Sequence, residues 1–304
     1  VGPVTGGYIT ALFSWRWVFY LNIPFGIAAA FAVGSALRDR PAEDAHQVDY
    51  AGALLLGGSV TLLIVALSGS GLEGGAGGGW VWPSYLGAAV LGAWLVRVER
   101  RAPEPMVPLD LLSNRMVAAI AATGVLVGVG MFGAISYVPL LVQEGLGGTP
   151  VEAGRALTPL ILGWVVTSMV TGRVVLSVGY RPMVLSGLSV VTVSFFGLSR
   201  IGAGSPPWAL PVVLVLMGMG MGMAVLSLVL AMQNVVPHRY LGVATSFGQF
   251  TRSIGGAVGV AVLGAVIAAS LPAGAFEPTD MAIGIQRAFL GATFVSAVAL
   301  LAAL

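Results

Sequence analysis

Two neighbouring stretches decide the fold of this chain: GPVTGG at residues 2–7 and WRWVFYLNIPFG at residues 15–26. The first lies in apolar sequence and predicts a helix kinked at Pro3, because proline removes a backbone hydrogen bond. Glycines at Gly2, Gly6 and Gly7 remove side-chain bulk from the same helix. A neighbouring helix can therefore pack against bare backbone, which is a common way for helices to associate in membranes.

The second stretch has the composition of a membrane interface. Trp15 and Trp17 fit an interfacial aromatic belt, and Arg16 between them fits a contact with lipid headgroups. Asn22 and Pro24 predict a fixed turn near the start of a spanning helix, with the amide satisfied by the protein.

The composition of the whole chain extends this interpretation. Only 9% of the 304 residues are charged and 57% are apolar, and the mean hydropathy is +0.96, whereas soluble domains carry about 25% charged residues. Such a chain must expose most of its side chains to lipid. With no cysteine and two histidines, the sequence excludes a disulfide framework and predicts no metal site and no cofactor. The fourteen basic residues are dispersed, which excludes nucleic-acid binding.

Glycine accounts for 44 residues, and many of these lie inside apolar runs. Four pairs have the four-residue spacing of packed membrane helices: Gly2–Gly6, Gly124–Gly128, Gly218–Gly222 and Gly255–Gly259. A single pair is weak evidence in a glycine-rich chain, but the set predicts close helix contacts.

Hydrocarbon about 30 Å thick needs about 20 apolar residues per helix. Polar and Pro/Gly-rich breaks divide the sequence into nine nearly complete spans and one stub, and both ends of the sequence look cut. The predicted spans are 1–13 (the stub), 18–37, 50–69, 82–97, 116–140, 155–173, 182–200, 209–232, 242–270 and 283–304.

The distribution of arginine predicts the orientation. If the segment after the second span is cytoplasmic, nine arginines lie on that side, four lie on the other, and Arg252 falls inside a span. Short cytoplasmic loops are enriched in basic residues, so this orientation is favoured.

The opening stretches also resemble a known family. GPVTGG resembles the antiporter motif of major facilitator exporters, and WRWVFYLNIPFG, including Gly26, resembles the signature that follows it in the fourteen-span drug/proton antiporters (EmrB/QacA-like). The resemblance implies an all-α integral membrane fold of two six-helix bundles with two additional central spans, of which the first four helices are missing here. It assigns residues 1–40 to the end of the first bundle, 41–115 to the additional spans and linker, and 116–304 to the second bundle.

The resemblance continues along the chain, with one degenerate motif. Gly172, Arg173, Gly179 and Arg181 have the spacing of the family's cytoplasmic loop motif, but Leu176 stands where an aspartate is expected. The ionic latch that this aspartate would supply cannot be assigned.

Charges at membrane depth are the main candidates for a functional site. All twelve acidic residues fall at or outside span ends, so the sequence shows no buried carboxylate for proton coupling. Arg252 either faces a cavity or domain interface, together with Gln249, or snorkels to the cytoplasmic surface. Tyr137 and Gln143 are further cavity candidates, while Glu144 is better explained as an exposed carboxylate.

The resemblance implies a secondary transporter of a bacterial plasma membrane that exports amphipathic organic compounds by proton antiport and alternating access. Its energy source would be the proton gradient, and its partners the bilayer, small organic substrates and protons; a periplasmic or membrane-fusion partner is left open. The alternative is an exporter of the same fold that is dedicated to one natural product, lipid or metabolite. An intramembrane enzyme would need clustered acids or histidines at membrane depth, which the sequence lacks.

Overall fold

The computed structural model describes residues 2–36, 49–72, 79–101, 114–236, 240–272 and 278–303. Within these ranges the chain runs back and forth in long helices, and nine of them are long and apolar enough to cross a membrane. The prediction of nine spans and one stub is therefore confirmed. The helices are α1 (Gly2–Leu12), α2 (Arg16–Ala36), α3 (Tyr50–Leu72), α4 (Val81–Glu99), α6 (Arg115–Leu140), α7 (Pro150–Val178), α8 (Tyr180–Leu198), α9 (Ala209–Val235), α10 (Leu241–Ser270) and α11 (Pro278–Ala302), with a π-helical segment η1 (Leu141–Gly145) after α6.

Helix α7 is longer than the predicted span, and its start explains why. Thr149 and Glu152 form a capping box, in which the Thr149 Oγ1 accepts from the Glu152 N–H and the Glu152 carboxylate accepts from the Thr149 N–H at 2.7 Å. Pro150 occupies the first helical position, where its missing N–H has no cost. The helix therefore begins at Pro150 rather than at the predicted residue 155.

Glycines form the contacts between the central helices, as their spacing predicts. A Cβ on Gly128 of α6 would strike the Arg252 carbonyl of α10, and one on Gly259 of α10 would lie 2.6 Å from the Val129 Cα of α6. In the same way, Gly218 and Gly222 of α9 meet the backbone of α7. These contacts leave no room for a side chain, so the two helix pairs are held at backbone-to-backbone distance.

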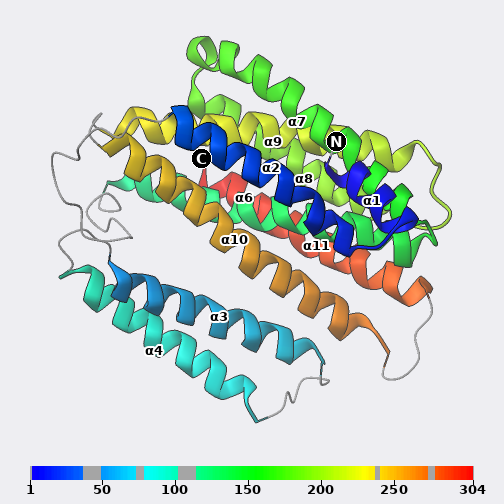
Figure 1. Ribbon diagram of the computed structural model, residues 1–304, viewed down its shortest axis with the longest axis horizontal. Helices are drawn as coiled ribbons and strands as arrows, with labels where there is room; N and C mark the ends of the chain where they lie inside the picture. The colour runs from blue at the N-terminus through cyan, green and yellow to red at the C-terminus, as the bar shows by residue number, and fades with distance from the viewer. Residues whose placement is uncertain are drawn as a thin grey trace.

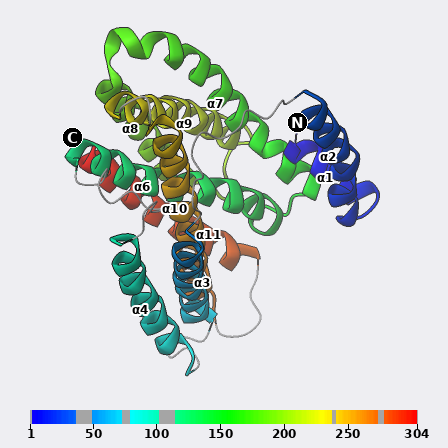
Figure 2. The same ribbon diagram turned by 60° about the vertical axis from the view of Figure 1, so that its left-hand side comes forward.

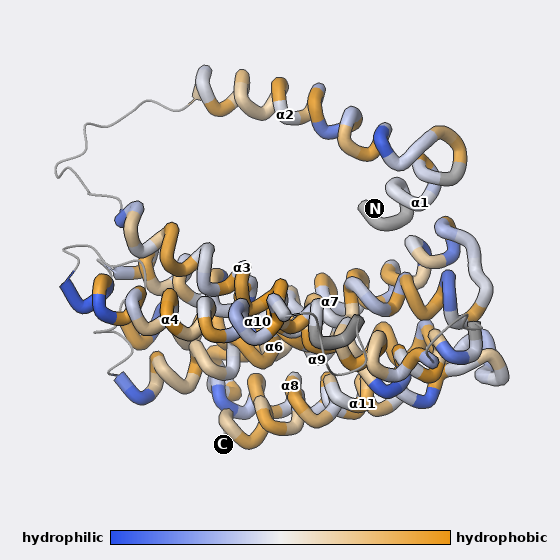
Figure 3. The backbone as a smooth tube through the Cα atoms, turned by 90° about the horizontal axis from the view of Figure 1, so that it is seen from below, coloured by the Kyte–Doolittle hydropathy of each residue, from blue (hydrophilic) through white to orange (hydrophobic). Residues whose placement is uncertain are grey.

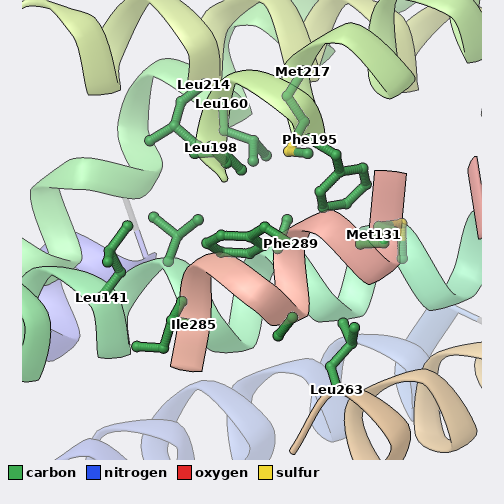
Figure 4. Close-up of a cluster of buried hydrophobic side chains, with 14 of the residues drawn as sticks. Met131, Leu141, Leu160, Phe195, Leu198, Leu214, Met217, Leu263, Ile285 and Phe289 are labelled. Atoms are coloured by element: carbon green, nitrogen blue, oxygen red, sulfur yellow. The ribbon is translucent and has the colours of Figure 1, made fainter. Parts of the chain in front are cut away.

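Larger side chains fill the space between the remaining helices. Phe195 of α8 and Phe289 of α11 are fully buried, and their ring centroids lie 6.2 Å apart (Figure 4). Met131 of α6, Met217 of α9 and Leu263 of α10 belong to the same apolar cluster. Helices α6 to α11 thus share one core.

The other helices attach to this bundle at separate places. Helices α3 and α4 pair with each other, and α3 packs against α10 on one side of the bundle (Figures 1 and 2). Helix α1 packs against α7, whereas α2 contacts α1 and has no buried residue. Figure 3 shows α2 as a largely hydrophobic helix that lies apart from the bundle.

The ends of the bundle differ in charge. Hydrophilic positions gather towards the helix ends (Figure 3). The end where α4, α7, α9 and α11 finish and where α6, α8 and α10 begin has the following arginines among the described residues: Arg97, Arg100, Arg101, Arg115, Arg173 and Arg181. We call it the arginine-rich end; the bias of cytoplasmic loops towards basic residues predicts that it is the cytoplasmic end. The predicted cytoplasmic residues Arg38, Arg40 and Arg239 lie outside the described residues.

Candidate functional site

The first candidate site is the contact between α1 and α7. A Cβ on Gly7 would lie 2.9 Å from the Pro150 carbonyl oxygen and 3.3 Å from the Val151 Cα, whereas nothing lies within 4 Å of a Cβ on Gly6. Beside this contact, Arg155 of α7 donates a hydrogen bond to the Tyr8 hydroxyl, and its guanidinium lies 5.2 Å from the centre of the Tyr8 ring. We call Gly7, Tyr8, Pro150, Val151 and Arg155 the α1–α7 seam.

The seam lies at the end of the bundle opposite the arginine-rich end, because α7 begins at Pro150 and finishes near Arg181. Of Gly6 and Gly7, whose surroundings are described, Gly7 meets α7. Gly2 and Pro3 lie in the first turn of α1, beyond the part of that helix whose side chains are described.

The prediction of a turn around Asn22 and Pro24 is wrong. Both residues lie inside α2, which begins at Arg16 and continues to Ala36. The Asn22 amide donates to the Val18 carbonyl of its own helix at 3.1 Å, so the polar group is satisfied one turn back without a turn in the chain. Nothing lies within 4 Å of a Cβ on Gly26.

The aromatic residues of the same stretch surround the start of α2. The Trp17 and Tyr20 rings lie 5.9 Å apart edge to face, and the Arg16 guanidinium lies 5.5 Å from the centre of the Trp15 ring. Both tryptophans are more than half exposed, which is the arrangement of an interfacial belt.

The second candidate site is Arg252 in α10. It is the twelfth residue of the helix, about 16 Å from its start at about 1.5 Å per residue, and it is 7% exposed. Its Nη2 donates to Gln249 Oε1 at 2.6 Å. Its low exposure favours the buried alternative over snorkelling, and residues of α6, α9 and α10 line the small cavity beside it.

The surroundings of Arg252 are nearly neutral. A cavity of about 10 Å³ beside it is lined by residues of α6, α9 and α10, including Thr245, Thr251 and Leu228. Within the described ranges no carboxylate forms an ion pair with Arg252. A charge in this position is expensive in a membrane, which makes Arg252 a candidate for a role beyond packing.

The third candidate site contains Tyr137. Its hydroxyl donates to the Val260 carbonyl of α10 at 2.6 Å and faces a cavity of about 320 Å³ between α3, α6 and α10. Ser68 is the other polar side chain in the wall, and the described lining has no charged residue. Gln143 lies elsewhere, in η1, where its amide donates to the Pro139 carbonyl at 3.5 Å. Glu144 in the same segment is exposed.

The degenerate loop motif does not form a loop. Gly172 and Arg173 lie inside α7, Arg181 lies in the first turn of α8, and Gly179 alone links the two helices. Gly179 has a φ of +95°, which favours glycine. Leu176, in the place of the expected aspartate, is 78% exposed.

Comparison with known proteins identifies the family. The Major Facilitator Superfamily pattern matches residues 1–260. The chain belongs to the major facilitator superfamily. Its helical architecture is the major facilitator fold, which is a fold of multi-pass membrane transporters rather than of enzymes.

Among the similar proteins of this superfamily are several drug transporters. The chain is 33% identical over 273 residues to the multidrug transporter protein MdtP of Bacillus subtilis, with 88% of this chain and 49% of the relative covered. It is 30% identical to the tetracenomycin C resistance and export protein of Streptomyces glaucescens, with 88% and 50% covered, and 28% identical to a multidrug resistance protein B homolog of Mycobacterium tuberculosis, again with 88% and 50% covered. The chain thus spans about half the length of these relatives.

The structure also places two acidic residues together that sequence reasoning missed. Glu99, the last residue of α4, is 3% exposed. Asp49 accepts a hydrogen bond from the Gly52 N–H at 2.8 Å at the start of α3. A Cβ on Gly52 would meet the Asp49 carboxylate and lie 3.0 Å from Glu99 Oε1. The expectation that no carboxylate is buried was therefore wrong for Glu99. The sequence feature that could have indicated this pair is that Asp49 and Glu99 stand at the same end of two adjacent spans.

Proposed function

We propose that this protein is an exporter of amphipathic organic compounds in a bacterial plasma membrane, driven by proton antiport through alternating access. We also propose that it has fourteen spans, with residues 116–304 as the second bundle and residues 41–115 as the additional spans and linker. The names of the relatives support export and resistance.

The observation that carries the proposal is the α1–α7 seam. Alternating access needs a contact between the two halves that closes one side of the membrane while the other is open. Gly7 lies on the bare backbone of α7 at the end opposite the arginine-rich end, where closure would seal the outer side. The resemblance of GPVTGG to the antiporter motif of major facilitator exporters implies the same role, sealing of the cytoplasm-facing state against leak.

The Tyr137 cavity supports apolar cargo. Its volume of about 320 Å³ falls at the lower limit of ligand pockets, which measure about 300–1,000 Å³. Small aliphatic residues such as Ala261 and Ala265 line it, and the hydroxyls of Ser68 and Tyr137 can orient a ligand.

The test is ethidium accumulation in an efflux-deficient bacterium that expresses the protein from its complete gene. Exclusion of ethidium that a protonophore abolishes is the expected result. Immunodetection in the membrane fraction provides the control for expression. If the protein is present in the membrane and ethidium is not excluded, multidrug export is refuted.

A dedicated exporter is the second candidate, and the relative from Streptomyces glaucescens favours it, because its name refers to one natural product, tetracenomycin C. Resistance to a single compound, without exclusion of ethidium, would select this function.

A further inference from the structure

A cavity at the arginine-rich end has the features of a lipid site. It measures about 210 Å³ and lies between the first turns of α6 and α8 and the last turns of α9 and α11. Its wall is mostly apolar, with Met116, Ile120, Ala231 and Ala302 among the lining residues, and Arg181 is its only charged residue within the described part of the chain. Neither the residues of the α1–α7 seam nor Arg252 nor Tyr137 line this cavity.

Two polar groups lie at one place in this wall. Arg181 is exposed, and a guanidinium can bind phosphate oxygens through two parallel N–H groups. The neighbouring Tyr180 hydroxyl accepts a hydrogen bond from the Asn234 amide of α9 at 2.8 Å. That contact fixes the hydroxyl and leaves its own hydrogen to be donated to a ligand oxygen.

The volume of the cavity, its apolar wall and the charge of Arg181 together select the class of ligand. Because the volume is below that of drug-sized pockets, about 300–1,000 Å³, the cavity holds part of an acyl chain rather than a whole drug. The wall supplies a positive charge and no described acid, which suits a phosphodiester without a compensating amine. Basic pockets between membrane helices on the cytoplasmic side bind anionic headgroups.

We propose that this cavity binds an anionic phospholipid of the cytoplasmic leaflet, with its phosphate on Arg181 and Tyr180 and one acyl chain along the apolar wall. Bound there, the lipid contacts four helices of one bundle at their cytoplasmic ends. Its binding is measured without transport, so the proposal stands or falls independently of the exported substrate.

The experiment compares lipid retention in native mass spectrometry after purification in a mild detergent and addition of phosphatidylglycerol or phosphatidylethanolamine. The wild-type protein is expected to retain phosphatidylglycerol preferentially. Arg181→Gln should weaken this binding about fivefold, the factor for one arginine at an anionic membrane surface. Arg173→Gln is the matched control, because Arg173 is an exposed arginine at the same end and does not line the cavity.

A second variant tests the position of the acyl chain. Ala302→Trp places an indole at the cavity wall in the exposed last turn of α11, and it should reduce phosphatidylglycerol retention while Arg181 is intact. Equal retention of the two lipids, equal losses in Arg181→Gln and Arg173→Gln, or unchanged binding in Ala302→Trp would each overturn the proposal. Competition by glycerol phosphate alone would identify a free-anion site instead.

Discussion

The α1–α7 seam allows a test with two adjacent glycines of the same helix. In Gly7→Ala, the new Cβ would lie 2.9 Å from the Pro150 oxygen, whereas ordinary contacts begin at 3.4 Å, so α1 must move away from α7 by about 0.5 Å. In Gly6→Ala the Cβ meets nothing within 4 Å. Both variants gain up to about 1 kcal/mol of helix propensity, and this gain cancels in their comparison.

The difference between the variants is therefore the cost of crowding at the seam. Overpacking costs about 1–3 kcal/mol, and this amount shifts an equilibrium between two conformations by about 5-fold to 150-fold. We expect Gly7→Ala to depopulate the conformation in which the seam is closed. The larger substitutions Gly7→Leu and Gly6→Leu should affect the population of the closed conformation in the same order, and the difference between them should be greater.

The assay is passive proton leak into proteoliposomes, together with ethidium exclusion in cells. Gly7→Ala should raise the leak and reduce exclusion, while Gly6→Ala should behave as the wild type at equal expression. If the two variants leak equally, or if Gly6→Ala has the greater effect, the seam does not seal the membrane and the reasoning fails.

Three further predictions concern the rest of the bundle. Replacing Arg252 by Met removes a buried charge, so thermal stability in detergent should stay equal or rise, while ethidium export at equal expression should fall; unchanged export would show that the charge has no role in transport. A Cβ on Gly255 would lie 2.8 Å from the Val125 Cα, so Gly255→Ala should lower the melting temperature, whereas Gly291→Ala, with open space around it, should not. Gly179→Ala at a φ of +95° should cost about 1–3 kcal/mol, measured by the same melting assay; equal melting of Gly179→Ala and the wild type would contradict the strain.

The number and order of the spans could be predicted from sequence because hydropathy along a single helix contains that information. Helix boundaries that were placed at charged residues were less accurate. The predicted span 155–173 ended at two arginines, but α7 runs from Pro150 to Val178 and includes both Arg155 and Arg173. Long basic side chains near helix ends reach water while their backbone stays helical. The capping box of Thr149 and Glu152 was the available signal for the true start.

Contacts between helices could be predicted only where the residue type determined the contact. Glycine pairs predicted close helix packing, and Gly128 and Gly259 occur at such contacts. The burial of Glu99 and of Arg252 depends on how each helix is rotated, which periodicity does not determine in helices that are apolar all round. For that reason Glu99 was taken for an exposed span end.

The position of Arg252 constrains the charge of the exported compound. Tyr137 bonds to Val260, which is eight residues from Arg252 and therefore about 12 Å along α10 at about 1.5 Å per residue. At an effective dielectric constant of about 20, two unit charges at that distance interact by about 1.4 kcal/mol, about tenfold in affinity. A cation in the Tyr137 cavity is disfavoured by this amount relative to a neutral molecule.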